Sequence, residues 1–159
     1  MEEVFSSDLV STFDASMAAL NASQGGFGDA PNLGVAVSGG SDSLALCLLA
    51  ADWCHKHGGK LTALTVNHGL RQEAGAEARQ VGQWLQKLNI DHKILSWSGP
   101  KPESAVQSRA RDARYYLLDE WCRNNGVDFL LVGHTAEDQA ETFMMRLQRD
   151  SGPDGLAGM

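Results

Sequence analysis

The fold of this 159-residue chain is decided at Val35-Ala36-Val37-Ser38-Gly39-Gly40-Ser41-Asp42-Ser43-Leu44-Ala45-Leu46. Here an apolar strand ends in a Ser-Gly-Gly-Ser-Asp-Ser loop, and a helical pattern begins at once. Two adjacent glycines lack Cβ atoms, so backbone N–H groups of the loop can close around an anion. The N-terminus of the following helix directs free N–H groups and partial positive charge to the same place. The stretch therefore predicts a strand–loop–helix unit that binds an anion.

The side chains of this loop indicate which anion it binds. The hydroxyls of Ser38, Ser41 and Ser43 add hydrogen-bond donors. Asp42 does not fit simple anion binding, because a carboxylate beside phosphates is repelled unless a cation lies between them. We therefore expect the loop to hold the pyrophosphate of a nucleotide, with Asp42 binding Mg²⁺.

Two better-known phosphate loops do not fit the sequence. The chain has no Gly-x-x-x-x-Gly-Lys-Ser/Thr, which excludes a Walker-type loop. Gly39 and Gly40 are adjacent, so the Gly-x-Gly-x-x-Gly fingerprint of dinucleotide-binding proteins is absent as well. The plain alternative is a Gly-Ser turn that only caps a helix, although a cap rarely needs two glycines and an acid.

The rest of the chain alternates short apolar runs with helical patterns. Strands are expected at 33–37, 61–66, 92–97 and 128–132, and helices at 2–21, 41–57, 73–88, 104–124 and 136–149. This order predicts an α/β fold, a Rossmann-like parallel sheet of about four to five strands with helices on both faces. Residues 1–32 are expected to form an N-terminal helix and loop, and residues 33–159 the nucleotide-binding domain.

Polar motifs follow two further predicted strands. Asn67-His68-Gly69-Leu70-Arg71 comes after the strand at 61–66, and Gly133-His134-Thr135 comes after the strand at 128–132. In such sheets the ligand lies outside the carboxyl ends of the strands. We therefore expect His68, Arg71 and His134 near the phosphate loop. An ordinary surface loop is the alternative for the first motif.

A predicted helix carries clustered arginines. Arg111, Arg114 and Tyr115 are spaced i, i+3, i+4, so they share one helix face. Arginines gathered on an acidic protein favour contact with phosphate or RNA. The alternative is a solvated face with local ion pairs to Asp112 and Glu120.

Three acids follow Thr135 within a few residues. Thr135 is a natural helix N-cap, and Asp138 could complete an arrangement like a capping box. That accounts for one acid but not for Glu137 and Glu141 as well. A carboxylate cluster opposite a phosphate loop could hold a second Mg²⁺ contact or an amine substrate.

Composition limits the class of protein and its partners. No apolar run approaches the ~18 residues needed to span a bilayer, and the N-terminus is acidic, so we expect a cytoplasmic protein without a membrane partner. The chain has three cysteines, Cys47, Cys54 and Cys122, and no Cys-x-x-Cys pair, which favours reduced thiols. All three lie in segments with a helical pattern. The net charge is −7, so any RNA partner must be held by a local patch or by parts not present here.

The motifs together resemble the tRNA(Ile)-lysidine synthetase family of PP-loop ATP pyrophosphatases. Five segments in this order carry the resemblance: Ser38–Ser43 with its SGGxDS signature, Asn67–Arg71, Ala110–Tyr115, Gly133–Thr142 and the tail Ser151–Met159. It covers nearly everything from Leu33 to the end. It implies ATP and Mg²⁺ as cofactors, L-lysine and a tRNA(Ile) with a CAU anticodon as substrates, and a PP-loop fold; it leaves a homodimer open.

The resemblance implies a reaction in two steps. ATP adenylates the C2 oxygen of the wobble cytidine and releases pyrophosphate; the lysine ε-amine then attacks C2 and expels AMP. The modified base, lysidine, reads AUA rather than AUG. By this resemblance we expect the ATP phosphates on the loop residues Ser38, Gly39, Gly40, Ser41, Asp42 and Ser43, with His134 also at the nucleotide. His68 and Arg71 would flank the nucleotide or the target base, and Arg111 and Arg114 would face phosphate or tRNA. Asp42 would hold the metal and Asp138 would lie near the metal or the lysine; Asp42, Glu137, Asp138 and Glu141 are the candidate catalytic acids, of which Glu137, Asp138 or Glu141 could accept the proton that lysine loses.

Two features depart from the family pattern, and rival functions remain. Family members often have an acid where Asn67 stands, and their catalytic domain continues past Met159 into tRNA-binding domains. We therefore expect this chain alone to be inactive in lysidine synthesis. The alternatives are a PP-loop tRNA 2-thiolation enzyme, an amidotransferase-type synthetase, and a non-catalytic adenine-nucleotide-binding protein like the universal stress proteins.

Overall fold

The structure is a computed structural model and describes residues 5–23, 26–69, 71, 73–98, 106–127, 129–133 and 142–146. Its elements are, in order, α1 (Ser7–Ser23), β1 (Asn32–Ala36), α2 (Ser41–Lys56), β2 (Lys60–Asn67), α3 (Ala74–Lys87), β3 (Asp91–Ser96), α4 (Val106–Asn124), β4 (Phe129–Gly133) and β5 (Thr142–Arg146). Between β1 and β4 the predicted alternation of strands and helices is confirmed, with boundaries that differ by a residue or two.

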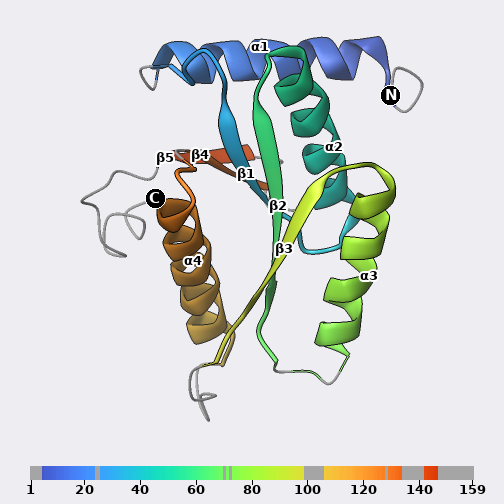
Figure 1. The fold of residues 1–159 in the computed structure, drawn as a ribbon, viewed down its shortest axis with the longest axis vertical. Helices are drawn as coiled ribbons and strands as arrows, with labels where there is room; N and C mark the ends of the chain where they lie inside the picture. The colour runs from blue at the N-terminus through green and yellow to red at the C-terminus, as the bar shows by residue number, and fades with distance from the viewer. Residues whose placement is uncertain are drawn as a thin grey trace.

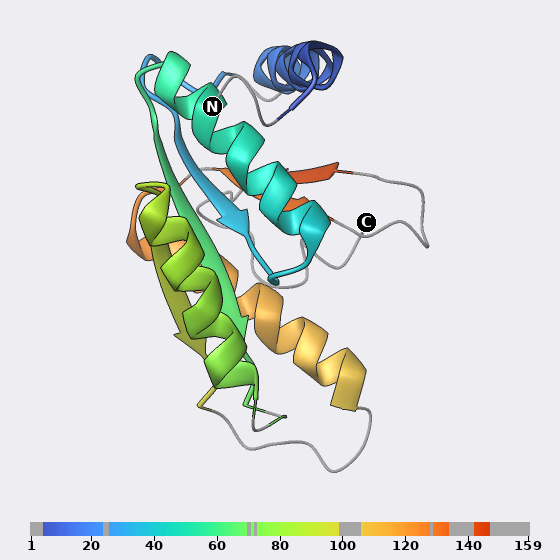
Figure 2. The same ribbon diagram turned by 90° about the vertical axis from the view of Figure 1, so that its right-hand side faces the viewer.

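The strands form one sheet in the order β3-β2-β1-β4-β5 (Figure 1). β1 lies at the centre, with Val35 opposite Ala63 of β2 and Leu131 of β4, and both pairings are parallel. β3 extends the sheet in parallel beyond β2. All four carboxyl ends therefore lie along the same edge of the sheet, and those of β1, β2 and β3 point toward the bottom of Figures 1 and 2. The predicted parallel sheet is confirmed.

Helices cover both faces of the sheet (Figure 2). Leu33 and Val35 of β1 belong to a core with residues of α1, α2 and α3, whereas Leu130 and Val132 of β4 pack with residues of α4 on the other face. Successive residues of a strand point to opposite faces, so each central strand serves both cores. Near-continuous apolar runs are the consequence. Among the described helices, none is both long enough and apolar enough to cross a lipid bilayer.

The helix predicted at 136–149 is wrong over Thr142–Arg146, which form the antiparallel strand β5 beside β4. Phe143 pairs with Val132 and Met144 with Leu131 in this register. A short apolar run is compatible with either a buried helix or a strand, and periodicity alone cannot separate them. The open edge of β4 supplies a ladder of main-chain hydrogen bonds that no local sequence pattern reveals.

His92 of β3 packs against α3 at a glycine. A Cβ atom added to Gly82 would lie 2.9 Å from the His92 Nδ1 atom, so the imidazole occupies the space that a larger residue would fill. The other ring nitrogen, Nε2, lies 2.8 Å from the Thr65 hydroxyl of β2. Burial lowers the pKa of His92 below its ordinary value of 6.5.

This packing predicts an inverted effect of a Gly→Ala substitution. In an ordinary helix interior Gly→Ala stabilises by about 1 kcal/mol. We expect Gly82→Ala instead to destabilise the protein by about 1–3 kcal/mol, because the new methyl group displaces the half-buried imidazole. Gly75→Ala is the matched control in the same helix, since its Cβ would meet only the flexible Arg79 side chain at 3.4 Å and Asn67 at 3.5 Å. Urea unfolding of both variants measures the difference, and equal shifts would contradict the packing.

The lowered pKa of His92 predicts a loss of stability in mild acid. The unfolded chain binds the proton at about its ordinary pKa of 6.5, whereas the folded chain binds it only at lower pH. The contribution is therefore fully present above pH 6.5 and is lost as the pH falls below it. Unfolding free energies at pH 7.5 and 5.5 should differ less in His92→Gln than in the wild type. The same difference in His92→Gln and in the wild type would contradict the lowered pKa of His92.

Candidate functional site: the phosphate loop at the carboxyl edge

The loop Ser38–Ser43 joins the carboxyl end of β1 to the first turn of α2. Gly39 has φ +92°, a left-handed conformation that favours glycine, and its Cβ would lie 3.1 Å from the Val81 side chain of α3. Gly40 is the extended N-cap residue of α2, and no side chain forms a capping hydrogen bond there. The alternative of a turn whose side chains simply cap the helix is therefore not what the structure shows.

The serine hydroxyls form a network inside the loop. The buried Ser43 hydroxyl donates to the Gly40 carbonyl (2.9 Å) and accepts from the Ser38 N–H (3.2 Å). Ser43 Oγ also lies 3.2 Å from Ser38 Oγ, which in turn accepts from the Gly40 N–H at 3.4 Å. The Ser41 hydroxyl donates to the Asp42 carboxylate at 3.2 Å. These hydroxyls hold the shape of the loop.

The amide hydrogens of the loop are left open. Within the described part of the chain, no acceptor bonds the N–H groups of Gly39, Ser41, Asp42 and Ser43. They lie at the positive end of the α2 dipole, where an anion is favoured. The Asp42 carboxylate is exposed in the same turn. In the described ranges it has no further His, Cys, Asp or Glu partners grouped to hold a metal ion with it.

The carboxyl end of β4 lies beside this loop, as predicted. A Cβ atom added to Gly133 would lie 3.8 Å from Ser43 Cα and 3.9 Å from the Asp42 carbonyl oxygen. The motif that begins at Gly133 therefore starts against the first turn of α2. Its candidate residues His134, Glu137, Asp138 and Glu141 lie outside the described residues.

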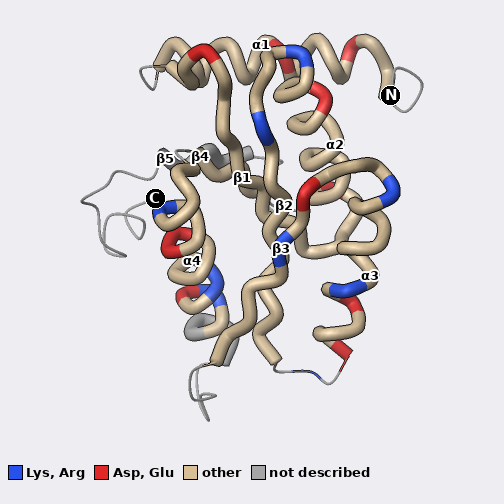
Figure 3. Tube along the Cα trace, in the orientation of Figure 1, with Lys and Arg blue, Asp and Glu red and all other residues tan. Residues whose placement is uncertain are grey.

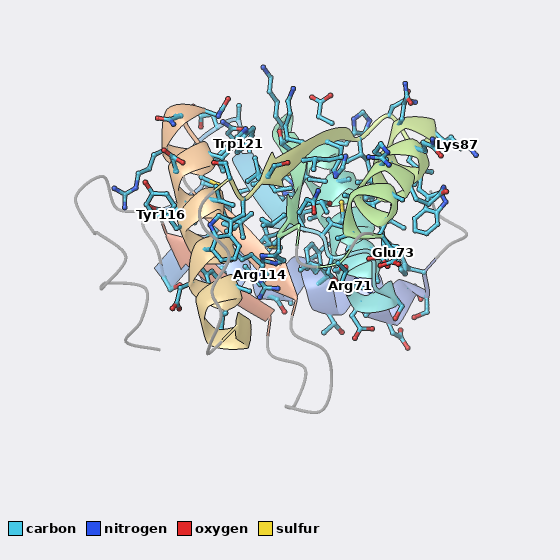
Figure 4. All side chains as sticks on the ribbon, turned by 90° about the horizontal axis from the view of Figure 1, so that it is seen from below. Arg71, Glu73, Lys87, Arg114, Tyr116 and Trp121 are labelled. Carbon is cyan, nitrogen blue, oxygen red and sulfur yellow. The ribbon has the colours of Figure 1, made fainter. Side chains whose placement is uncertain are left out.

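The segment after β2 is held by its own contacts. Asn67 Oδ1 accepts from the Gly69 N–H at 3.0 Å, and its carbonyl accepts from the Trp97 N–H at 3.0 Å. The Arg71 guanidinium forms an exposed ion pair with Glu77 of α3 at 2.7 Å. His68, half-buried, lies at the same edge of the sheet. Figure 4 shows Arg71 next to the start of α3.

The arginine face of α4 forms as the spacing predicts. The guanidinium carbons of Arg111 and Arg114 lie 5.6 Å and 5.3 Å from the centroid of the Tyr115 ring. Among the described residues neither arginine forms an ion pair with Asp112 or Glu120. Figure 3 shows basic and acidic residues along α4. Arg114 Nε is buried without a hydrogen-bond partner in this part of the chain. An unmatched buried donor is costly, so an acceptor oxygen there would be favourable.

The sequence pattern did not identify two polar residues behind the loop, Thr65 and His92. The buried Thr65 hydroxyl donates to the Val37 carbonyl at 2.9 Å, immediately before the loop, and contacts His92 behind it. The signal that could have identified Thr65 is a lone hydroxyl in an otherwise apolar buried strand.

The three cysteines are buried in the core. Cys47, Cys54 and Cys122 are each at most 1% exposed. Burial raises the pKa of each thiol to about 12, with Asp119 adding to the effect at Cys122. None of them can present a thiolate at the phosphate loop.

Comparison with curated proteins identifies close relatives that are longer than this chain. This chain is 50% identical over 132 residues to the tRNA(Ile)-lysidine synthase of Rhodopseudomonas palustris. It is also 50% identical over 127 residues to that of Wolbachia pipientis. The matches cover 82% and 79% of this chain but only 38% and 30% of those proteins. The chain therefore spans about a third of the length of the relatives that it matches.

Comparison with solved structures agrees with the fold. The U34-tRNA thiolase NcsA from Methanococcus maripaludis, with its 4Fe-4S cluster, superimposes with a TM-score of 0.66 over 84% of this chain and 48% of that chain. The sequence identity is 19%, so the likeness concerns the fold. The family described as PP-loop domain matches residues 10–159, which include the whole phosphate loop. With an open-amide loop between β1 and α2 and a family match over nearly its full length, the chain belongs to the PP-loop domain family.

Proposed function

We propose that this chain is the nucleotide-binding part of an ATP-dependent ligase. The ligase attaches L-lysine to the wobble cytidine of a tRNA(Ile) with a CAU anticodon, in the cytoplasm. The observation that carries the proposal is a phosphate loop whose backbone N–H groups are open to a ligand. It lies in a chain that is 50% identical, over 82% and 79% of its length, to two tRNA(Ile)-lysidine synthases. Adenylation of the C2 oxygen releases pyrophosphate, and displacement of AMP by the lysine ε-amine yields lysidine.

The backbone of the loop would bind the α- and β-phosphates of ATP. The open N–H groups of Gly39, Ser41, Asp42 and Ser43 are the donors, and the α2 dipole favours the negative charge. The hydroxyls of Ser38 and Ser43 support this arrangement from within. Fixed donors of this kind need little reorganisation as charge moves onto the leaving pyrophosphate.

The residues present fit a magnesium ion. Mg²⁺ prefers oxygen ligands and commonly combines one or two carboxylates with phosphates and water. Asp42 supplies an exposed carboxylate in the same turn as the open amides. We propose Asp42 and Asp138 as the carboxylates that hold the ion, whose chemistry is to neutralise phosphate charge. Glu137 and Glu141 would, with Asp138, accept the proton that lysine loses before it attacks.

The remaining site residues would bind the RNA and the nucleotide. Arg114 offers an unmatched buried Nε donor, and Arg111 lies on the same aromatic ring, so both suit a phosphate or base oxygen of the tRNA. Arg71 would join them by exchanging Glu77 for substrate. His68 and His134 would flank the nucleotide.

The chemistry of the cysteines argues against the thiolation alternative. A thiolation enzyme that uses cysteine sulfur or a cluster needs accessible thiolates near the nucleotide. All three cysteines of this chain are buried, and their pKa values are raised to about 12. The arginine face of α4 argues against a non-catalytic nucleotide-binding protein, because such a protein needs only the phosphate loop to bind its ligand.

A graft tests the function. The matching segment of the Rhodopseudomonas palustris enzyme is replaced with this chain and assayed with ATP, Mg²⁺, lysine and CAU-anticodon tRNA(Ile). We expect pyrophosphate release that requires both lysine and this tRNA, with AMP formed in equal amount. Release without lysine would indicate adenylation followed by other chemistry, and a graft that binds ATP but releases no pyrophosphate would contradict the proposal.

Two carboxylate variants test the site within the same graft. Asp42→Asn and Asp138→Asn should each lower the rate of lysidine formation by at least about a hundredfold, because a lost charge at a reacting phosphate costs several kcal/mol. Asp29→Asn, which changes an exposed acid outside the loop, is the control for net charge. Turnover near the wild-type rate in either variant would remove that residue from the mechanism.

A pair of glycine variants separates backbone strain from ligand binding. Gly39 and Gly58 both have positive φ values, +92° and +66°, so alanine should destabilise either site by about 1 kcal/mol. Only Gly39→Ala also presses on Val81 and distorts the amides of the loop. Calorimetry with magnesium pyrophosphate should therefore show at least tenfold weaker binding for Gly39→Ala and unchanged binding for Gly58→Ala. Equal affinities would contradict the proposed binding role of the loop.

A further inference from the structure

We propose that Thr65 and His92 are positioning residues for the phosphate loop, which they hold through the peptide between Val37 and Ser38. The inference deepens the proposed function and rests on it. It is carried by a line of hydrogen bonds that crosses three strands and ends in the loop. Neither residue touches the nucleotide; both act through the backbone.

The proton order along this line follows from its ends. The Thr65 hydroxyl donates its only proton to the Val37 carbonyl at 2.9 Å. The contact of 2.8 Å between Thr65 Oγ1 and His92 Nε2 then requires Nε2 to be the donor. His92 therefore carries a proton on Nε2, and burial, which lowers its pKa, favours the neutral form of that tautomer over the imidazolium.

The hydroxyl takes over where the strand ladder ends. The Val37 N–H still bonds the Leu64 carbonyl at 2.8 Å. Among the described residues no main-chain donor bonds the Val37 carbonyl, which would be unsatisfied without Thr65. A buried carbonyl without a donor costs free energy, so the hydroxyl has a defined task here.

The planar peptide transmits this anchor into the loop. The Val37 carbonyl and the Ser38 N–H belong to one trans peptide plane and point in opposite directions. Fixing the carbonyl on Thr65 therefore aims the Ser38 N–H at the Ser43 hydroxyl, 3.2 Å away. Ser43 donates onward to the Gly40 carbonyl, the N-cap of α2. The hydrogen bonds thus run from β3 to Gly40, the residue that precedes the open amides of Ser41, Asp42 and Ser43.

The neighbours of the line preserve it. Gly82 leaves room for the His92 ring, and Thr65 is only 6% exposed. Valine, an apolar residue of the same shape, would fill the space of Thr65 but would lose both the hydrogen bond to the Val37 carbonyl and the one from His92 Nε2. Because the Val37 N–H keeps the ladder in register, the loss of the hydroxyl frees the carbonyl without separating the strands.

Amide hydrogen exchange of the loop tests the proposal. In Thr65→Val we expect the Ser38 amide to exchange at least tenfold faster, while the Val35 amide inside β1 is unchanged. Thr65→Ser, which keeps the hydroxyl, should restore slow exchange. Thr62→Val is the matched control, because Thr62 lies on the same strand with its side chain on the opposite face. His92→Met, which removes the donor at the far end, should give a smaller acceleration, and it substitutes for Thr65→Val if that variant does not fold.

Binding of magnesium pyrophosphate to the same variants links the line to function. We expect about tenfold weaker binding in Thr65→Val and wild-type affinity in Thr65→Ser and Thr62→Val. Exchange of Ser38 at the wild-type rate in Thr65→Val, or equal acceleration in Thr62→Val, would overturn the positioning role. If the wild type fails to bind pyrophosphate while Thr65 still controls exchange, the proposed function fails and the anchor stands.

Discussion

The structure depends on one constraint: the chain must pass from a central buried strand into a helix without closing the helix N-terminus. No side chain caps α2, and Gly39 turns through a left-handed conformation against Val81. The amides that a cap would satisfy are left to a ligand. β1 is the central strand, so this opening lies in the middle of the carboxyl edge, where the neighbouring strands deliver their own loops.

Side chains and backbone divide the work of the loop. The hydroxyls of Ser38 and Ser43 form hydrogen bonds within the loop. The hydroxyl of Thr65 donates to the carbonyl of the Val37–Ser38 peptide. The main-chain N–H groups, which no substitution removes except proline, are the groups directed at the ligand. A loop built in this way can be shaped by its sequence while its binding chemistry stays in the backbone.

The limits of prediction from sequence follow the range of the interactions. The strands, the loop and the arginine face of α4 were predictable, because apolar runs and i, i+3, i+4 spacing are local patterns. Strand β5 was not, since the free edge of β4 decides it. The ion pair of Arg71 with Glu77 and the contact of His92 with Thr65 were also beyond reach, because each joins segments that only the fold brings together. The roles of His134, Glu137, Asp138 and Glu141 stay predictions.

The distribution of charge bears on the proposed RNA substrate of this acidic chain. Affinity for RNA comes mostly from phosphate contacts, and a net charge of −7 opposes them at long range. The favourable charge is local, because Arg111 and Arg114 flank Tyr115 on the face of α4. Within the described ranges the buried Nε atom of Arg114 has no hydrogen-bond partner. A guanidinium presents its donors in a fixed planar fork, which suits a specific acceptor oxygen. In the proposed function these arginines would therefore orient the RNA near the reacting cytidine, and they would contribute little to long-range attraction.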